Sequence, residues 1–168
     1  MNIEIAPRDI LQIDDARICY RNFKGEKSMY NDEGKRNFSL VIPNMEVAEM
    51  LQNNVNKYGV GWNVKISAPK IPDAEPFIHL PVAVKYTDRS QPRVYLISGR
   101  NRRELTEDTI AILDDIDIES VSMDIRPYDD EGRFGPFRKA YLMSIYVTQK
   151  IDRLAARFAG DDDRDYED

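Results

Sequence analysis

The strongest constraint on the fold is a long alternation of apolar and polar residues on both sides of one glycine-containing turn. Residues 121–126 (VSMDIR) and 141–147 (YLMSIYV) alternate with a period of two, and residues 129–137 (DDEGRFGPF) lie between them. Because side chains two apart share one face of a strand, each segment predicts a half-buried β-strand. The glycines and the proline favour a turn, so we expect a long antiparallel hairpin.

The rest of the chain predicts further strands and little helix. Phe38 and Trp62 lie in alternating segments, so both side chains are expected in the core. Asn44 is a suitable N-cap for an amphipathic helix that ends at Gly59, and Thr106 begins a second, short helix. The other predicted strands cover residues 18–23, 36–42, 62–66, 82–86 and 93–97. The first two of these form a hairpin around a long polar loop.

These elements place the chain in the α+β class with a mostly antiparallel sheet, because strands and helices do not alternate throughout. We predict an OB-fold-like five-stranded barrel with an additional hairpin and one or two helices. The length of 168 residues suits one domain. We assign residues 1–158 to this nucleic-acid-binding domain and residues 159–168 to a flexible acidic C-terminal tail.

The net charge of −6 is concentrated near the end of the sequence. Residues 161–168 (DDDRDYED) hold six carboxylates and one arginine, a local charge of −5, so the remaining residues together carry −1. A nearly neutral body can still present a basic groove to a polyanion.

Composition excludes several kinds of site. Cys19 and His79 are each the sole residue of their type, which rules out an internal disulfide and a structural zinc site. We interpret His79 as structural. The sequence contains no phosphate-binding or nucleophile-elbow motif, so we predict no cofactor and no enzymatic activity. It also lacks a bilayer-spanning apolar run and the order of a signal peptide, which predicts no membrane contact and a cytoplasmic location.

Four carboxylates form the densest acidic group of the predicted domain: Asp114, Asp115, Asp117 and Glu119. We interpret this group as a solvated turn, because no basic or nucleophilic partner stands at a recognisable spacing from it. A two-metal nuclease that binds magnesium here is the alternative that the sequence leaves open.

Cationic residues interleaved with aromatic residues are the pattern that indicates a function. Single-stranded DNA offers phosphates to neutralise and unstacked bases that lie on flat rings. Residues 17–38 hold six lysines or arginines against three acids, residues 85–103 hold six against one acid, and residues 132–139 (GRFGPFRK) form a third such segment. We therefore predict a DNA-binding surface made of Arg17, Tyr20, Arg21, Phe23, Lys24, Lys27, Tyr30, Lys35, Arg36, Lys85, Tyr86, Arg89, Arg93, Tyr95, Arg100, Arg102, Arg103, Arg133, Phe134, Phe137 and Arg138.

Position in the chain separates rings that stack on bases from rings of the core. Three aromatic residues in predicted loops are expected to stack: Tyr30, Phe134 and Phe137. Four more aromatic residues in the basic segments fit either location: Tyr20, Phe23, Tyr86 and Tyr95. Of these, we include Tyr20 and Phe23 among the stacking rings. Tyr141 is assigned to the core because it shares the predicted face of Met143 and Ile145. The run GRNRR is expected in a turn, where arginines reach phosphates.

The acidic tail has two interpretations, solubility alone or competition with DNA for the basic groove combined with the docking of a partner protein. Carboxylates tethered near a cationic channel have a high effective concentration, which favours competition. The residues assigned to this tail function are Asp161, Asp162, Asp163, Asp165, Tyr166, Glu167 and Asp168.

Three strings, YNDEGKRNFSLVIP, GWNVK and IRPYDDEGRFGPFRKAYLMSIYVT, resemble bacteriophage single-stranded DNA-binding proteins over roughly residues 15 to 150. The resemblance implies an OB-fold protein that coats single-stranded DNA in phage replication or recombination, without sequence preference and without a cofactor. The tail is similar to tails that recruit polymerase, helicase or recombinase partners. In the better-known tails the aromatic or apolar residue stands last, whereas here Glu167 and Asp168 follow Tyr166.

The resulting hypothesis is a non-enzymatic protein whose partner is single-stranded DNA and whose tail recruits replication or recombination proteins. If a phage encodes it, the location is the host-cell cytoplasm. The sequence leaves the oligomeric state open, a homo-oligomer included. The alternative function is a phage inhibitory protein whose acidic surface imitates DNA.

Overall fold

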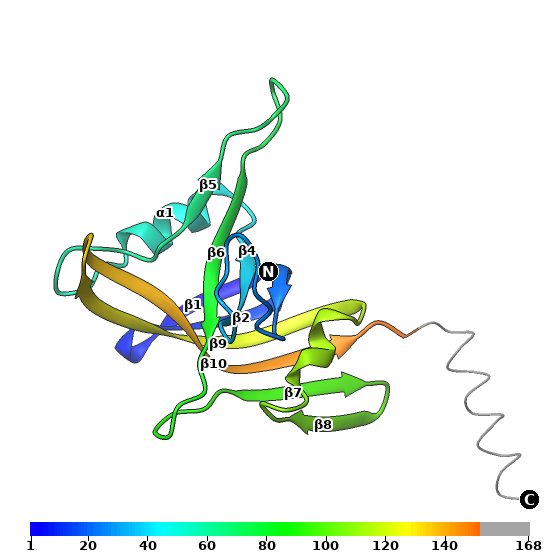
Figure 1. Cartoon of the computed structure of the whole chain (residues 1–168). Helices are drawn as coiled ribbons and strands as arrows, with labels where there is room; N and C mark the ends of the chain where they lie inside the picture. The colour runs from blue at the N-terminus through cyan, green and yellow to red at the C-terminus, as the bar shows by residue number, and fades with distance from the viewer. Residues whose placement is uncertain (152–168) are drawn as a thin grey trace, which may run out of the picture.

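The structure, a computed structural model that describes residues 1–151, is one curled mixed sheet with a single α-helix (Figure 1). The predicted tail and the last part of the predicted domain lie outside the described residues. The strands are β1 (Asn2–Ala6), β2 (Ile10–Ala16), β3 (Ile18–Asn22), β4 (Arg36–Val41), β5 (Lys65–Ser67), β6 (Phe77–Val84), β7 (Arg93–Ser98), β8 (Asn101–Leu105), β9 (Ile118–Gly132) and β10 (Gly135–Gln149). The helices are α1 (Met45–Asn53) and two 3₁₀ turns, η1 (Pro7–Asp9) and η2 (Ile110–Asp114).

The predicted long hairpin is confirmed and forms the centre of the sheet. β9 and β10 pair antiparallel from the Gly132–Gly135 turn to Ile118 and Gln149, which is longer than the alternation alone predicts. β2 pairs with the other edge of β9, while β6 and β7 share the other edge of β10, both parallel to it. β10 therefore carries a different neighbour at each end.

A β-bulge at Met143 changes which side chains of β10 face the core. Leu142 pairs with Ile125 and Ser144 pairs with Asp124, so Met143 is an extra residue without a partner. Inward-facing positions are even-numbered before the bulge and odd-numbered after it. The assignment of Tyr141 to the core is therefore wrong, because this side chain points to the outer face and is only half-buried.

The order of strands differs from the expected five-stranded barrel. Ten strands belong to the sheet, and its main path runs β1-β2-β9-β10-β6-β4-β3, with β5, β7 and β8 attached beside it. The coarser prediction, a mostly antiparallel sheet with little helix, is confirmed. The count of five strands is not confirmed, because β1, β2 and β8 were not separated from loops by their sequence pattern.

The predicted hairpin of residues 18–23 and 36–42 is present as β3 and β4. Phe38 and Trp62 are buried, as expected. Phe23 is buried too and stacks on Phe38, with 5.2 Å between ring centroids. The inner face of the sheet is thus closed by aromatic as well as aliphatic side chains.

The helix α1 begins as the sequence predicts, since the side chain of Asn44 accepts a backbone hydrogen bond in its first turn (2.9 Å). The prediction that it runs to Gly59 is wrong, because it ends at Asn53. The side-chain oxygen of Asn56 accepts two backbone N–H bonds from the residues that follow it, which closes a turn in place of helical bonds. The chain then returns so that Trp62 packs beneath the helix end.

Two further expectations change near residue 100. The run GRNRR lies only partly in a turn, because Gly99 and Arg100 form the turn whereas residues 101–105 form β8 and pair with β7. The short helix expected from Thr106 is the 3₁₀ turn η2 instead. Among residues 1–151, no helix is long and apolar enough to cross a membrane.

Candidate nucleic-acid interface

The outer face of the β9–β10 hairpin carries a row of stacked rings. Tyr128 and Tyr141 stack with 4.8 Å between centroids and 10° between planes, and Phe137 lies 5.8 Å from Tyr128. Two cations contact the row: Lys139, the register partner of Tyr128, lies 4.6 Å from the Phe137 centroid, and Arg126, the register partner of Tyr141, lies 4.9 Å from the Tyr141 centroid. We refer to Phe137, Tyr128 and Tyr141 as the Tyr141 row.

A second pair of rings lies farther along β10. Tyr95 of β7 and Tyr146 of β10 are partners in the register and stack with 4.8 Å between centroids. The Arg102 guanidinium of β8 lies 4.5 Å from the first ring and 5.2 Å from the second. We refer to Tyr95 and Tyr146 as the Tyr146 stack.

The Met143 bulge places both groups of rings on one face. Tyr141 and Tyr146 lie opposite Arg126 and Ser122 of β9, which keeps an uninterrupted alternation across this region. Both tyrosines therefore point outward, roughly 15 Å apart along the strand at about 3.3 Å per residue. We name this surface, the Tyr141 row with the Tyr146 stack and their cations, the aromatic face.

Cations outnumber acids on and beside the aromatic face. The cationic side chains are Arg93, Arg102, Arg126 and Lys139 on the strands, with Lys35 and Lys85 around a cavity that Tyr141 also lines. The acids that point the same way are Glu104, Asp124 and Asp130. Asp14 lines a pocket with Asp124 and Tyr146, and Glu107 lines the cavity beside Tyr141. Burial, with Asp14 nearby, raises the pKa of Asp124. The face thus combines stacked rings with a local excess of positive charge.

Strand β3 and the loop between β3 and β4 add a second exposed region. Tyr30 is 93% exposed and Tyr20 is 67% exposed, and both line a cleft of about 730 Å³ with Lys27. Asn37 lines this cleft and also the cavity beside Tyr141. The first predicted segment and the aromatic face are therefore contiguous.

The tip of the β9–β10 hairpin carries Phe134, which is 97% exposed, with Arg133 at 5.8 Å from its ring. Arg89, Arg100 and Arg103 are also exposed, in the loop before β7 and in the β7–β8 hairpin. These side chains fit the predicted surface by exposure.

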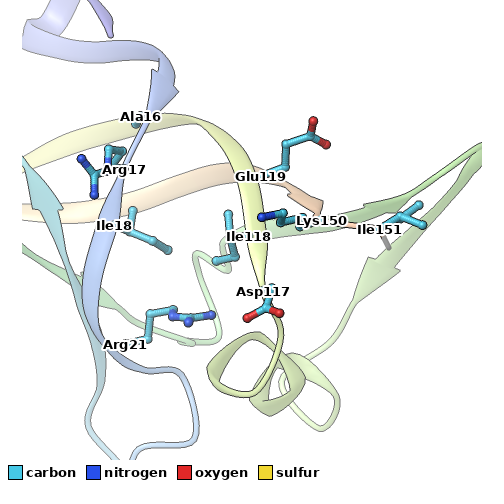
Figure 2. Close-up of a pocket in the computed structure, with 9 residues that line it drawn as sticks. All are labelled: Ala16, Arg17, Ile18, Arg21, Asp117, Ile118, Glu119, Lys150 and Ile151. Carbon is cyan, nitrogen blue, oxygen red and sulfur yellow. The ribbon is translucent and has the colours of Figure 1, made fainter. Parts of the chain in front are cut away.

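Arg17 and Arg21 lie apart from the aromatic face. They line a cavity of about 950 Å³ in which Asp117, Glu119 and Lys150 stand opposite (Figure 2). The Arg21 guanidinium also donates to two backbone carbonyls of the η2 region at 2.7 and 2.8 Å. This cavity has mixed charge, so Arg17 does not extend the cationic surface. Arg21 also lines the cleft of Tyr20 and Tyr30.

Phe23 and Arg138 were predicted to contact DNA, and the structure contradicts both predictions because the two side chains are buried. Lys24 and Arg36 are partly neutralised, by Asp115 at 3.0 Å and by Glu107 at 3.4 Å. A residue in a predicted loop was therefore not always exposed, and a lysine or arginine was not always free of an acidic partner.

The acidic group near η2 has structural partners. Both carboxylate oxygens of Asp114 accept backbone N–H groups, from Phe23 at 2.8 Å and Lys24 at 3.0 Å, which fixes the end of β3. In the described part of the chain, no three acidic, histidine or cysteine side chains are grouped as metal ligands. The geometry gives the nuclease alternative no support.

His79 belongs to a small cluster on the outer side of β6. Its Nδ1 lies 2.9 Å from the Ser39 hydroxyl, and its ring stacks on Phe77 at 5.3 Å with Tyr20 edge-on at 5.4 Å. Burial, helped by the charge of Lys65, lowers the pKa of His79. A neutral ring held by a hydroxyl and two aromatic neighbours agrees with a structural role.

The end of the β9–β10 hairpin lies beside the segment after α1 (Figure 1), where Arg138 fixes it. The guanidinium donates to Asp129 at 2.9 and 3.0 Å, to Asp9 at 3.0 Å and to both oxygens of Asn54. It also lies 5.3 Å from the Trp62 ring centroid. This buried network holds the hairpin that carries the Tyr141 row.

Asp129 makes this network sensitive to acid. Burial raises the pKa of this carboxyl, but hydrogen bonds from Arg138 and Asn56 outweigh burial, so the pKa lies below its ordinary value. A carboxyl with a lowered pKa in the folded state contributes stability above its unfolded pKa of about 3.9, and that contribution is lost as pH falls through the folded value.

We expect the free energy of unfolding to drop between neutral pH and about pH 3, and Asp129→Asn to make this drop smaller. Urea unfolding of both proteins across that range measures the difference. Asp130→Asn, a neighbouring exposed acid without the Arg138 contact, is the control and should keep the steeper wild-type drop. Equal pH dependence for all three proteins would contradict the role of Asp129.

Five residues of the aromatic face were missed by sequence reasoning: Arg126, Tyr128, Lys139, Tyr141 and Tyr146. For the first two a signal existed, because the alternation of residues 121–126 continues through Tyr128 and places even-numbered side chains outward. The outward direction of Tyr146 agrees with the alternation after the bulge. That of Tyr141 depends on a bulge that the sequence does not mark.

Comparison with known proteins gives one family and one group of structures. The model of the phage ssDNA-binding domain family matches residues 2–166. The single-stranded DNA-binding protein of bacteriophage Enc34 in complex with ssDNA has a TM-score of 0.56 at 20% identity, over 90% of this chain and 92% of that one. A C-terminal truncation of the Enc34 protein gives 0.55 at 20% identity, over 90% and 91% of the two chains. Among curated proteins no match was found.

Proposed function

This chain belongs to the phage ssDNA-binding domain family, and from this premise we propose that it binds single-stranded DNA along the aromatic face without sequence preference. The observation that carries the proposal is the alignment of the Tyr141 row and the Tyr146 stack on one side of β10, each with cations beside it. Flat rings accept any base, and cations accept any phosphate, so this combination gives affinity without base selection.

Binding would exchange contacts within the face for contacts with DNA. The Arg126 guanidinium lies over the Tyr141 ring in the free protein. An unstacked base can take that place on the ring while the arginine turns to a phosphate. Arg102 and the Tyr146 stack offer the same exchange. Phe134, almost fully exposed at the hairpin tip, would extend the path beyond Phe137. Tyr30, also almost fully exposed, would extend it sideways through the cleft that adjoins the cavity beside Tyr141.

We propose that the curled part of the sheet is an OB-type barrel. β2 and β3 are separated by Arg17 alone and form one bent segment. β2 pairs with β9 and β3 pairs with β4, and these two partner strands are not neighbours in the sheet. The parallel pairing of β6 with β10 supports the same arrangement. In OB folds the loops that join the first strand to the second and the fourth strand to the fifth contact oligonucleotides. We assign the β3–β4 and β9–β10 loops, which carry Tyr30 and Phe134, to these two positions.

The wider biological role is a further part of the proposal. We propose that the protein coats DNA in phage replication or recombination in the host-cell cytoplasm, and that residues 161–168 compete with DNA and recruit partner proteins. The support for the tail is its charge of −5 beside a body of −1.

Titration with labelled oligonucleotides tests the central proposal. We expect tighter binding to single strands than to a duplex of the same length, because only unpaired bases reach the rings. The logarithm of the binding constant should fall linearly with that of salt concentration, by about 0.7 for each phosphate contact. Equal affinity for duplex and single strand would contradict stacking on the aromatic face.

Removal of residues 161–168 is expected to tighten DNA binding at low salt and to matter less at high salt, because screening weakens competition by the tail. Titrations of the full chain and the shortened chain at two salt concentrations measure this. If the protein were instead an inhibitor that imitates DNA, the same deletion would abolish its activity. Unchanged DNA affinity at both salts would reject tail competition.

A further inference from the structure

A cavity of about 310 Å³ lies between β4, β6 and β10, next to the Tyr141 row. Four cations line it: Arg36 of β4, Lys139 of β10, and Lys35 and Lys85 from the loops next to β4 and β6. One carboxylate, that of Glu107 in the loop between β8 and η2, faces them. We name this cavity the Arg36 cavity. Its charge and its position beside a stacking ring fit an anionic group attached to a base.

Two polar atoms of the Arg36 cavity lack partners. Arg36 Nε and Tyr86 Oη are inaccessible to solvent and have no hydrogen-bond partner among the residues that the structure describes. Burial raises the pKa of Tyr86 to about 12, so its hydroxyl keeps the proton and remains a donor. Unpaired buried donors are costly in a folded protein, and an acceptor brought by a ligand would satisfy them after small side-chain rotations.

The ion pair of Arg36 in the free protein is weak, and the guanidinium also lies 5.8 Å from the Tyr86 ring centroid. Its Nη1 lies 3.4 Å from the Glu107 Oε1, and the Glu107 side chain is 51% exposed. An ion pair of this length at a solvent-accessible carboxylate is easily exchanged for a better partner. A phosphate offers more acceptor oxygens to the planar guanidinium than this single oxygen does.

We propose that the Arg36 cavity binds one phosphate of the DNA backbone and that Glu107 is an internal competitor which the phosphate displaces from Arg36. This inference rests on the proposed function and adds a residue that opposes binding. Lys35, Lys85 and Lys139 surround the phosphate, and the attached base is directed toward Tyr141, which lines the same cavity. The affinity of the wild-type protein is thereby set below what its cations alone would give.

Glu107→Gln removes the competitor and keeps the shape of the side chain. We expect it to tighten binding of a labelled single-stranded oligonucleotide about two- to fivefold, the range that corresponds to loss of an exposed ion pair. Asp108→Asn is the matched control, since it changes the net charge equally at an exposed acid that does not line the cavity. We expect a clearly smaller change for the control at the same salt concentration.

Arg36→Gln completes the experiment as a double-mutant cycle. In this background Glu107→Gln is expected to give no more than the small gain of the Asp108→Asn control, because the pair is already broken. Equal gains in DNA affinity for Glu107→Gln and Asp108→Asn would overturn the inference. So would a full gain from Glu107→Gln in the Arg36→Gln background. In both cases the proposed function would stand as long as the wild-type protein binds single-stranded DNA. Absence of single-stranded DNA binding by the wild-type protein would overturn both. The comparison of Glu107→Gln with Asp108→Asn stands even if Arg36→Gln unfolds.

Discussion

Tyr141→Ala is expected to lower the affinity for single-stranded DNA about tenfold or more. Stacking of a base on an aromatic side chain contributes about 1 to 3 kcal/mol, and the Tyr141 ring lies in the middle of the aromatic face. Its loss also leaves Tyr128 without its stacking partner at 4.8 Å and Arg126 without the ring beneath it. Fluorescence anisotropy with a labelled oligonucleotide measures the change.

Tyr141→Phe is the matched control, because it keeps the ring and removes only the hydroxyl. We expect its affinity to stay close to that of the wild-type protein, with thermal unfolding of both variants showing that the fold is kept. Wild-type affinity for Tyr141→Ala would place the DNA elsewhere. A loss for Tyr141→Phe as large as that for Tyr141→Ala would show that the hydroxyl and not the ring is used.

The sequence predicted those parts of the fold that depend on local pattern. The β9–β10 hairpin, the β3–β4 hairpin and the start of α1 each follow from alternation, turn residues or a capping side chain. β1 and β2 were missed because the first residues mix acids into an apolar pattern, and their pairing is a long-range property. Helix α1 was predicted too long because asparagine side chains after Asn53 compete with helical hydrogen bonds.

The class of function followed from the sequence better than the residues did. Membership of a family of ssDNA-binding domains confirms the predicted class and the prediction that the chain is not an enzyme. The basic and aromatic composition of the loops pointed to this ligand, while the strands carried the best-organised rings. A bulge at Met143 moved Tyr141 outward, and such a bulge has no mark in the residue pattern.

The two neighbouring cations Arg138 and Lys139 show that composition alone does not predict which charges are exposed. Arg138, in the basic turn segment, is the most buried arginine of the described chain, whereas Lys139 beside it is exposed on the aromatic face. Neighbouring residues of a strand point to opposite sides, so one cation enters a carboxylate network and the other stays available to DNA. A basic run therefore predicts a surface only after its strand register is known.

Arg138→Met is expected to lower the free energy of unfolding by about 3 to 5 kcal/mol, the cost of removing one partner from a buried ion pair. The variant keeps much of the side-chain volume but leaves Asp129 and Asp9 without their shared cation. It also removes the guanidinium from the Trp62 ring. Urea unfolding at neutral pH measures the loss.

Arg133→Met, an exposed arginine in the turn of the same hairpin, is the control for the removal of one positive charge. We expect it to leave the free energy of unfolding within about 0.5 kcal/mol of the wild-type value, as surface substitutions do. The sequence-based assignment of Arg138 to the DNA surface makes the opposite prediction, unchanged stability with weaker DNA binding. Because the Arg138 side chain is 3% exposed and makes hydrogen bonds to three residues, we expect loss of stability to be the main effect of Arg138→Met.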